Sequence, residues 1–147
     1  YVGKNKEVSE KDVQEVVGET KLETVFSLTD ALKNKNPHKA LQLLQNQLDH
    51  GEEPIKILGT IAWQFRVIWE VKHYQQRNIP SGQIAKAMGA NPFVVEKALQ
   101  HTKKFSTQQL RRSYSQLTQA DRSLKSTSQD PVAVMQTLIL GLTANSH

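Results

Sequence analysis

Apolar residues recur along most of the chain at the three- and four-residue spacing of an α-helix. After Pro37, for example, Ala40, Leu41, Leu44 and Leu48 follow one another at this spacing. The chain shows no convincing run in which β-branched and polar residues alternate between turn residues, the pattern that is typical of strands. The sequence therefore predicts an all-α protein.

Residues that start and stop helices divide the chain into short stretches. A first short helix is predicted from Ser9 to a glycine stop at Gly18. Asparagine or serine caps, and proline in the first turn, then indicate helices near 22–34, 37–50, 54–77, 83–88, 92–104, 107–124 and 131–142. Because the connections are short, we expect a compact bundle of about six to seven helices after the short first one.

The stretch 54–77 is the longest predicted helix, at roughly 35 Å. Its apolar residues cover most of the circumference: Ile55, Ile57, Leu58, Ile61, Ala62, Phe65, Val67, Ile68, Trp69, Val71 and Tyr74. A helix that is apolar on so many sides is surrounded by other elements. This stretch is therefore predicted to be the central helix of the bundle.

Two tryptophans on this helix are candidates for a partner interface. Trp63 and Trp69 are six residues apart, which places them about 120° apart around the helix axis. In one interpretation a single tryptophan packs in the core and the other anchors a partner, since aromatic residues are preferred at protein interfaces. In the other, both are buried by different neighbours.

The composition narrows the chemistry that the chain can perform. It contains no cysteine, so disulfides, zinc–thiolate sites and a thiol nucleophile are absent, which fits a reducing cytoplasm. The most apolar segment, 55–71, is interrupted by charged residues and is too short to cross a bilayer. We therefore expect a soluble chain without a membrane partner.

Positive charge gathers in the second half of the chain. The net charge is +5, but residues 1–60 carry 8 Lys and Arg against 10 Asp and Glu, whereas residues 61–147 carry 11 against 4. Six basic residues are candidate nucleic-acid contacts: Lys103, Lys104, Arg111, Arg112, Arg122 and Lys125. Residues 111, 115, 118, 122 and 125 share one polar helix face, which either holds phosphates without reading sequence or simply keeps the helix solvated.

Catalytic, cofactor-binding and metal-binding residues are not indicated. The five histidines are far apart, and none forms a pair on one helix face that would suit a metal ion. The glycines do not form a phosphate-binding loop of the GxxxxGK[ST] type. The early carboxylates lie among lysines on a short predicted helix, as in a solvated surface. The sequence thus predicts a chain that is not an enzyme by itself and takes no cofactor.

Residues 83–104 have the outline of a DNA-reading helix-turn-helix. Ala85 lies in the first helix, Gly89 in the turn, and valine a turn into the second helix. However, the second helix opens with Pro92 and continues with apolar residues and Glu96, where base readout requires Arg, Gln, Asn, Ser or Thr. The stretch is better interpreted as a corner between packed helices. A stand-alone DNA-binding regulator that uses 83–104 remains the alternative.

The order of these signals is similar to that of a known family. Four segments carry the resemblance: VSEKDVQEVVGET at 8–20, FSLTDALKNKNPHKALQLLQNQLDHGEEPIKILGTIAWQFR at 26–66, QIAKAMGANPFVVEKAL at 83–99 and LTQADRSLKSTSQDPVAVMQTLIL at 117–140. Together they resemble the C-terminal part of the delta subunits of bacterial DNA polymerase III clamp loaders. No short motif is specific by itself, and the similarity lies in the colinear series.

The resemblance implies a domain organisation and a set of partners. Residues 1–18 would be the tail of a lid domain, and residues 19–147 a helical collar domain that joins a pentameric loader. The partners would be the gamma/tau and delta-prime subunits through the collar, the sliding clamp through an N-terminal domain absent from this chain, and primer-template DNA in the assembled loader. Delta-like subunits are also expected to lack ATPase activity.

Overall fold

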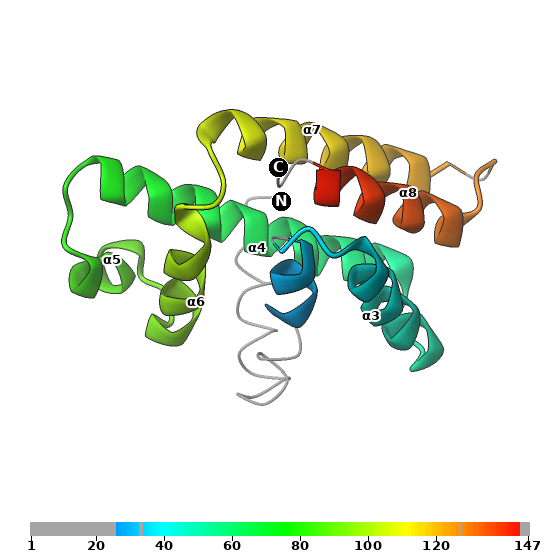
Figure 1. Ribbon diagram of the computed structural model, residues 1–147, viewed down its shortest axis with the longest axis horizontal. Helices are drawn as coiled ribbons and strands as arrows, with labels where there is room; N and C mark the ends of the chain where they lie inside the picture. Colours follow the sequence, from blue (N-terminus) through cyan, green and yellow to red (C-terminus); the bar gives the residue numbers. More distant parts are fainter. Residues whose placement is uncertain (1–25, 33, 127, 145–147) are drawn as a thin grey trace.

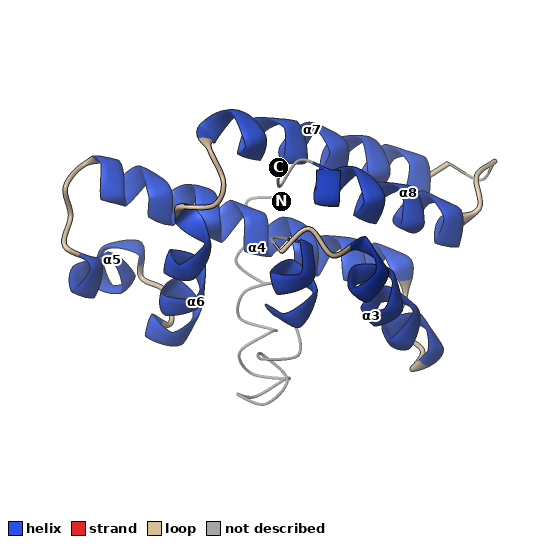
Figure 2. Cartoon of the chain, viewed as in Figure 1, coloured by secondary structure: helices blue, strands red, loops and turns tan. Residues whose placement is uncertain are grey.

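The computed structural model describes residues 26–32, 34–126 and 128–144. This part of the chain contains α3 (Pro37–Asp49), α4 (Pro54–Gln76), α5 (Ser81–Met88), α6 (Pro92–Thr102), α7 (Thr107–Leu124) and α8 (Pro131–Ala144). Residues 26–32 form a further helical segment, and no strand occurs among the described residues (Figure 2). The predicted all-α fold is confirmed. The predicted helix from Ser9 to Gly18 lies outside the described residues.

Helix α4 runs through the middle of the molecule, with α7 along one side of it and α5 and α6 on the other, while α3 packs against α8 (Figure 1). It packs against α5, α6, α7 and α8. Its buried residues lie on nearly all of its sides: Ile57, Leu58, Ile61, Trp63, Gln64, Phe65, Val67, Ile68 and Val71. The prediction of a central helix over 54–77 is therefore confirmed.

The helix boundaries follow from local capping. The side chain of Asn36 accepts a hydrogen bond of 3.0 Å from the backbone N–H of Lys39 at the start of α3. At the start of α7, Ser106 and Gln109 form a reciprocal capping box, with bonds of 3.1 and 2.8 Å. Gly89 ends α5 in the left-handed region, at φ 67°, where the lack of a Cβ removes the steric penalty.

Aromatic rings connect α4 to its neighbours on both sides. The ring centroids of Phe26 and Trp63 lie 6.1 Å apart, which joins segment 26–32 to α4. Phe65 and Phe105 lie edge to face at 5.5 Å, which joins α4 to the turn between α6 and α7. Offset and edge-to-face arrangements are the preferred geometries of aromatic pairs. These contacts fix the positions of segments that are distant in the sequence.

Two boundaries around α5 and α6 differ from the prediction, and α8 extends two residues further than predicted, to Ala144. Helix α5 begins at Ser81, two residues earlier than predicted, because the N–H of Gln83 already bonds to the carbonyl of Pro80 at 2.8 Å. Helix α6 ends at Thr102 and not at residue 104. The chain turns there because Phe105 is buried in the core.

Candidate partner and nucleic-acid surfaces

The six basic residues proposed as nucleic-acid contacts lie along α7 and at its two ends. Two follow the end of α6, three belong to α7, and one caps the C-terminus of α7. Because α7 rises about 1.5 Å per residue, the six spread along the helix and do not form a single cluster. All six side chains are exposed: Lys103, Lys104, Arg111, Arg112, Arg122 and Lys125.

Five exposed residues form one continuous surface of α7, which we call the α7 polar stripe: Arg111, Ser115, Thr118, Arg122 and Lys125. Their spacing of four and three residues places them on one side of the helix. The opposite side of the helix is buried, through residues 110, 113, 117 and 120. The structure thus places these five residues on one solvent-facing surface, as the sequence predicted.

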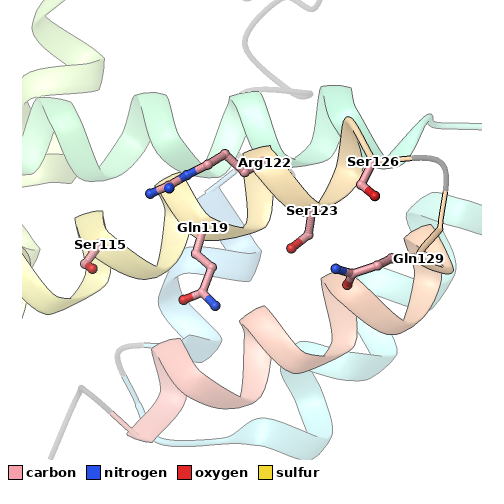
Figure 3. A pocket seen from close by; sticks show the side chains of 6 residues that line it. All are labelled: Ser115, Gln119, Arg122, Ser123, Ser126 and Gln129. Atoms are coloured by element: carbon pink, nitrogen blue, oxygen red, sulfur yellow. The ribbon is translucent and has the colours of Figure 1, made fainter.

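A shallow open depression of about 330 Å³ borders the stripe near the C-terminal end of α7 (Figure 3). The side chains of Gln119 and Ser123 point from α7 toward α8, that of Gln129 points toward them from the loop before α8, and Arg122 extends along α7 away from them. No carboxylate lines this depression: its residues are Ser115, Gln119, Arg122, Ser123, Ser126 and Gln129. Its lining therefore consists of hydroxyl, amide and guanidinium groups.

One carboxylate belongs to α7, and a lysine of the stripe engages it. Asp121 Oδ2 lies 2.9 Å from Lys125 Nζ, in an i,i+4 pair whose side chains are 42% and 68% exposed. An exposed pair of this kind stabilises the fold by only about 0–1 kcal/mol. Among the described residues, no carboxylate lies within ion-pair distance of Arg111, Arg112 or Arg122. The surface of α7 is therefore positive on balance.

The two tryptophans have different environments. Trp63 is 1% exposed and packs against Phe26, so it belongs to the core. As the chain is folded here it is not available to a partner, and the interpretation of Trp63 as an interface residue is corrected. Trp69 is half-buried, and its ring lies edge-on to Tyr114 at 5.6 Å. Of the two candidates, only Trp69 reaches the surface.

Tyr114 has the spacing of the apolar residues Leu110 and Leu117 on α7, yet it is 36% exposed. Ser113 is buried in its place. Both α4 and α8 pack against α7, so the buried side of α7 is wider than its apolar residues alone indicate. Partial burial raises the pKa of the Tyr114 hydroxyl above its ordinary value of 10.0, while Arg66 opposes this effect and Glu70 adds to it. Arg66 and Glu70 form an ion pair of 3.7 Å on α4.

Helix α8 exposes a surface that the sequence interpretation missed. The sequence from Pro131 to Ala144 contains no charged residue. Four of its residues nonetheless face solvent on one side of the helix, and we call them the α8 outer face: Ala133, Thr137, Leu140 and Ala144. Leu140 is 50% exposed. The absence of charge over these fourteen residues is the sequence signal that could have indicated a helix with apolar residues on its exposed side as well as its buried side.

Helices α7 and α8 approach closely at Gly141. A Cβ at this position would come within 2.9 Å of Gln116 Nε2, so a larger residue would displace that side chain. Between the two helices lies a groove of about 610 Å³, to which Asp130 contributes the one charged group. The α8 outer face therefore borders a surface with almost no charge.

The structure argues against base readout by residues 83–104. Val94 and Val95, in the first turns of α6, are 0% and 2% exposed. Phe93 lies edge-on to Phe26 at 6.4 Å, and Lys97 stacks above the Phe93 ring at 5.6 Å. A recognition helix must expose these positions to reach the major groove. The helix-turn-helix interpretation is therefore wrong for this fold, and the stretch is a packed corner.

The described residues contain no group of three or more His, Cys, Asp or Glu that could hold a metal ion. His101 Nε2 and Asp30 Oδ1 form a pair at 3.0 Å. None of the described helices is both long enough and apolar enough to cross a membrane. The surfaces above are therefore the candidate functional features of the described chain.

The described residues form an all-α domain with a central apolar helix and a positively charged outer helix. Residues 22–142 match the model of a family described as DNA polymerase III delta subunit, C-terminal domain, and the chain belongs to this family. The family agrees with the prediction that the chain is not itself an enzyme.

Two relatives define the similarity further. The chain is 29% identical over 142 residues to DNA polymerase III subunit delta of Bacillus subtilis (strain 168), an alignment that covers 97% of this chain and 41% of that protein. Its structure resembles that of the Bacillus subtilis DNA clamp loader delta protein, with a TM-score of 0.79 and 29% identity, over 91% of this chain and 40% of the other. The chain thus spans about two fifths of the length of these relatives.

Proposed function

We propose that this chain is a non-catalytic assembly domain that joins other clamp-loader subunits in the cytoplasm of a bacterium. Its partners would be the helical C-terminal domains of the gamma/tau and delta-prime subunits, in a pentameric loader that places the sliding clamp on primed DNA. Membership of the delta-subunit family supports the loader assignment. In this proposal residues 1–18 end a lid domain, residues 19–147 form the collar, and contact with the sliding clamp falls to an N-terminal domain outside this chain.

The observation that carries the docking role is the α8 outer face. A helix without charged residues loses little when water is removed from its surface, because no ion has to be desolvated. Leu140, at 50% exposed, is the largest apolar side chain that this face presents. Protein interfaces have such apolar residues at their centre and polar residues at their rim. We therefore assign Leu140 and its neighbours on the α8 outer face to a subunit contact.

Size-exclusion chromatography of the chain with the gamma/tau and delta-prime C-terminal domains of the same organism tests the proposal. The unmodified chain is expected to elute with the partners as a complex. Leu140→Glu places a charge at the centre of the contact, so we expect it to elute alone. Gln42→Glu, an exposed change on α3, is the matched control and should leave the complex intact.

The chain must remain folded for this comparison to count. Thermal unfolding followed by circular dichroism should give similar midpoints for the chain and both variants, since residues 42 and 140 are exposed. Elution of the unmodified chain as a lone monomer in the presence of its partners would contradict the assembly role. Co-elution of Leu140→Glu to the same extent as the unmodified chain would remove α8 from the contact.

A further inference from the structure

Helix α4 contains an interior glycine that the packing of the described residues does not require. Gly59 lies within this 23-residue helix and is exposed. Glycine is the least favourable residue after proline inside a helix, because it loses the most backbone freedom on folding. A Cβ at this position would meet no other part of the fold within 4 Å, so alanine would fit without a clash. What the glycine provides is an open helix backbone that another molecule can approach closely.

An exposed isoleucine lies one helical turn before this glycine. Ile55 and Gly59 are four residues apart, which places them on the same side of α4. The Ile55 side chain is 41% exposed, and the other exposed large hydrophobic residues of the described chain are Tyr114 and Leu140. Glu52 lies in the turn just before α4, three residues from Ile55. We call Glu52, Ile55 and Gly59 the Ile55 patch, which lies at the end of α4 opposite to α5 (Figure 1).

Negative charge surrounds the Ile55 patch. Residues 49–56 carry three carboxylates and one lysine, whereas the whole chain has a net charge of +5. Glu52 and Glu53 are exposed, and among the described residues no cation lies within ion-pair distance of either. Glu53 is the N-cap residue of α4, yet its side chain makes no capping hydrogen bond. Both carboxylates are therefore available to a positively charged partner.

The chemistry of the Ile55 patch selects a protein as its ligand. An apolar centre with a charged rim is typical of protein interfaces. Nucleic acid does not fit, because binding to its phosphates depends on positive charge and these carboxylates repel them. A metal ion does not fit either, because the described part of the chain contains no group of three or more potential ligands. The matching partner surface carries lysine or arginine beside an apolar side chain.

We propose that the Ile55 patch is a second docking surface of this domain, which takes a basic surface of a neighbouring loader subunit. This inference rests on the proposed function, because each member of a ring uses two different surfaces for its two neighbours. The α8 outer face provides the first contact, through Leu140. At the second contact an apolar side chain of the neighbour packs on Ile55, over the open backbone of Gly59. Lysine or arginine residues of the neighbour pair with Glu52 and Glu53 at the rim.

Isothermal titration calorimetry with the gamma/tau and delta-prime C-terminal domains of the same organism, one at a time, tests the inference. Gly59→Leu should weaken the binding of one domain at least about tenfold, because the leucine fills the space that the close approach requires. It should leave the binding of the other domain, which uses Leu140, unchanged. Leu140→Glu should show the reverse pattern.

Gly82→Leu on α5 is the matched control. A Cβ at Gly82 also meets no other part of the fold within 4 Å, so both substitutions place the same side chain on an open helix surface. Helix α5, which is described throughout, exposes no large hydrophobic residue, so Gly82→Leu should change neither affinity. Equal losses for the two leucine variants would show that the effect is not specific to the Ile55 patch and would overturn the proposal.

A charge variant tests the basic character of the partner. Glu52→Gln should weaken the binding that Gly59→Leu weakens by about two- to fivefold at low salt, since one exposed ion pair is lost. The salt dependence of this binding should also become shallower. Glu96→Gln, which removes an exposed carboxylate from α6, is the control and should change neither quantity. Equal affinity and equal salt dependence for Glu52→Gln and the unmodified chain would overturn the assignment of a basic partner.

The isolated 147-residue chain shows whether the patch is covered from within. Gly59→Ala should raise the midpoint of thermal unfolding by about 2–4 °C, because alanine is the better helix former and displaces nothing. A lower midpoint would mean that the same chain covers the patch, and would overturn the proposal. Self-association of the unmodified chain that Gly59→Leu abolishes would assign the patch to a second copy and would overturn it as well.

Failure of this inference differs from failure of the assembly role. If the unmodified chain binds both domains and Gly59→Leu binds both equally well, the Ile55 patch is not a contact and the assembly role stands. If the unmodified chain binds neither domain, the assembly role is contradicted and the second docking surface with it.

Discussion

Single residues determine which parts of the surface can act. Trp63 and Trp69 have the same side chain on the same helix, yet one is 1% exposed and the other half-buried. The six intervening residues turn them toward different neighbours, Phe26 in one case and Tyr114 in the other. The residue type therefore indicated two candidate interface residues, and the packing of neighbouring segments decided that only Trp69 is accessible to solvent.

Tyr114 gives the fold a dependence on alkaline pH. Because partial burial holds the pKa of its hydroxyl above 10.0, the unfolded chain loses this proton at a lower pH than the folded chain does. The contribution of Tyr114 to stability is therefore complete below pH 10 and is lost as the pH rises through the folded pKa. Tyr114→Phe should show a smaller fall in the free energy of unfolding above pH 10, measured by urea titration at several pH values.

Tyr74 is the control for this measurement, since it is a partly buried tyrosine on α4. Tyr74→Phe should retain the alkaline fall that Tyr114→Phe loses. Parallel stability curves for Tyr114→Phe and the unmodified chain above pH 10 would show that Tyr114 ionises equally easily in both states.

At the scale of elements, capping residues decide where each helix begins. Proline in the first turn opens α3, α4, α6 and α8, and asparagine side chains cap α3 and α6. These signals are local in sequence, so the starts of these four helices could be predicted correctly. The C-terminal end of α6 and the exposure of Tyr114 could not be predicted in this way, because they depend on packing against α4.

The capping box of α7 provides a direct test of local stabilisation. Ser106→Ala removes the acceptor for the Gln109 N–H and should lower the free energy of unfolding by about 1 kcal/mol. Ser115→Ala makes the same chemical change at an exposed position inside the helix, where alanine is the better helix former, and should cost nothing. Chemical denaturation of both variants checks the difference. Equal stability of the two would mean that solvent replaces the cap.

At the scale of the whole molecule, contacts between distant segments hold the bundle together. His101 Nε2 on α6 lies 3.0 Å from Asp30 Oδ1 in segment 26–32, across 71 residues of sequence. The His101 side chain is 1% exposed, whereas that of Asp30 is 42% exposed. A buried polar ring that loses a partner costs more than the hydrogen bond alone contributes. This pair therefore connects α6 to segment 26–32, which lie below α4 in Figure 1.

Asp30→Ala should lower the free energy of unfolding by about 1–3 kcal/mol, because it removes the carboxylate that lies 3.0 Å from the buried His101 imidazole. Glu96→Ala, an exposed carboxylate on α6, is the control and is expected to stay within about 0.5 kcal/mol of the unmodified chain. Urea unfolding of the two variants provides the comparison. If both changed stability by the same small amount, the pair would make no contribution to holding the segments together.

The sequence by itself determined the helical class, the central position of 54–77 and the polar stripe of α7, because helical periodicity and capping are properties of neighbouring residues. The tertiary structure alone decided that Trp63 is core, that Val94 and Val95 are closed to DNA, and that α8 leaves Leu140 uncovered. Exposure depends on which elements pack against a residue. The partners of each helix face come from distant parts of the chain, and no local pattern contains that information.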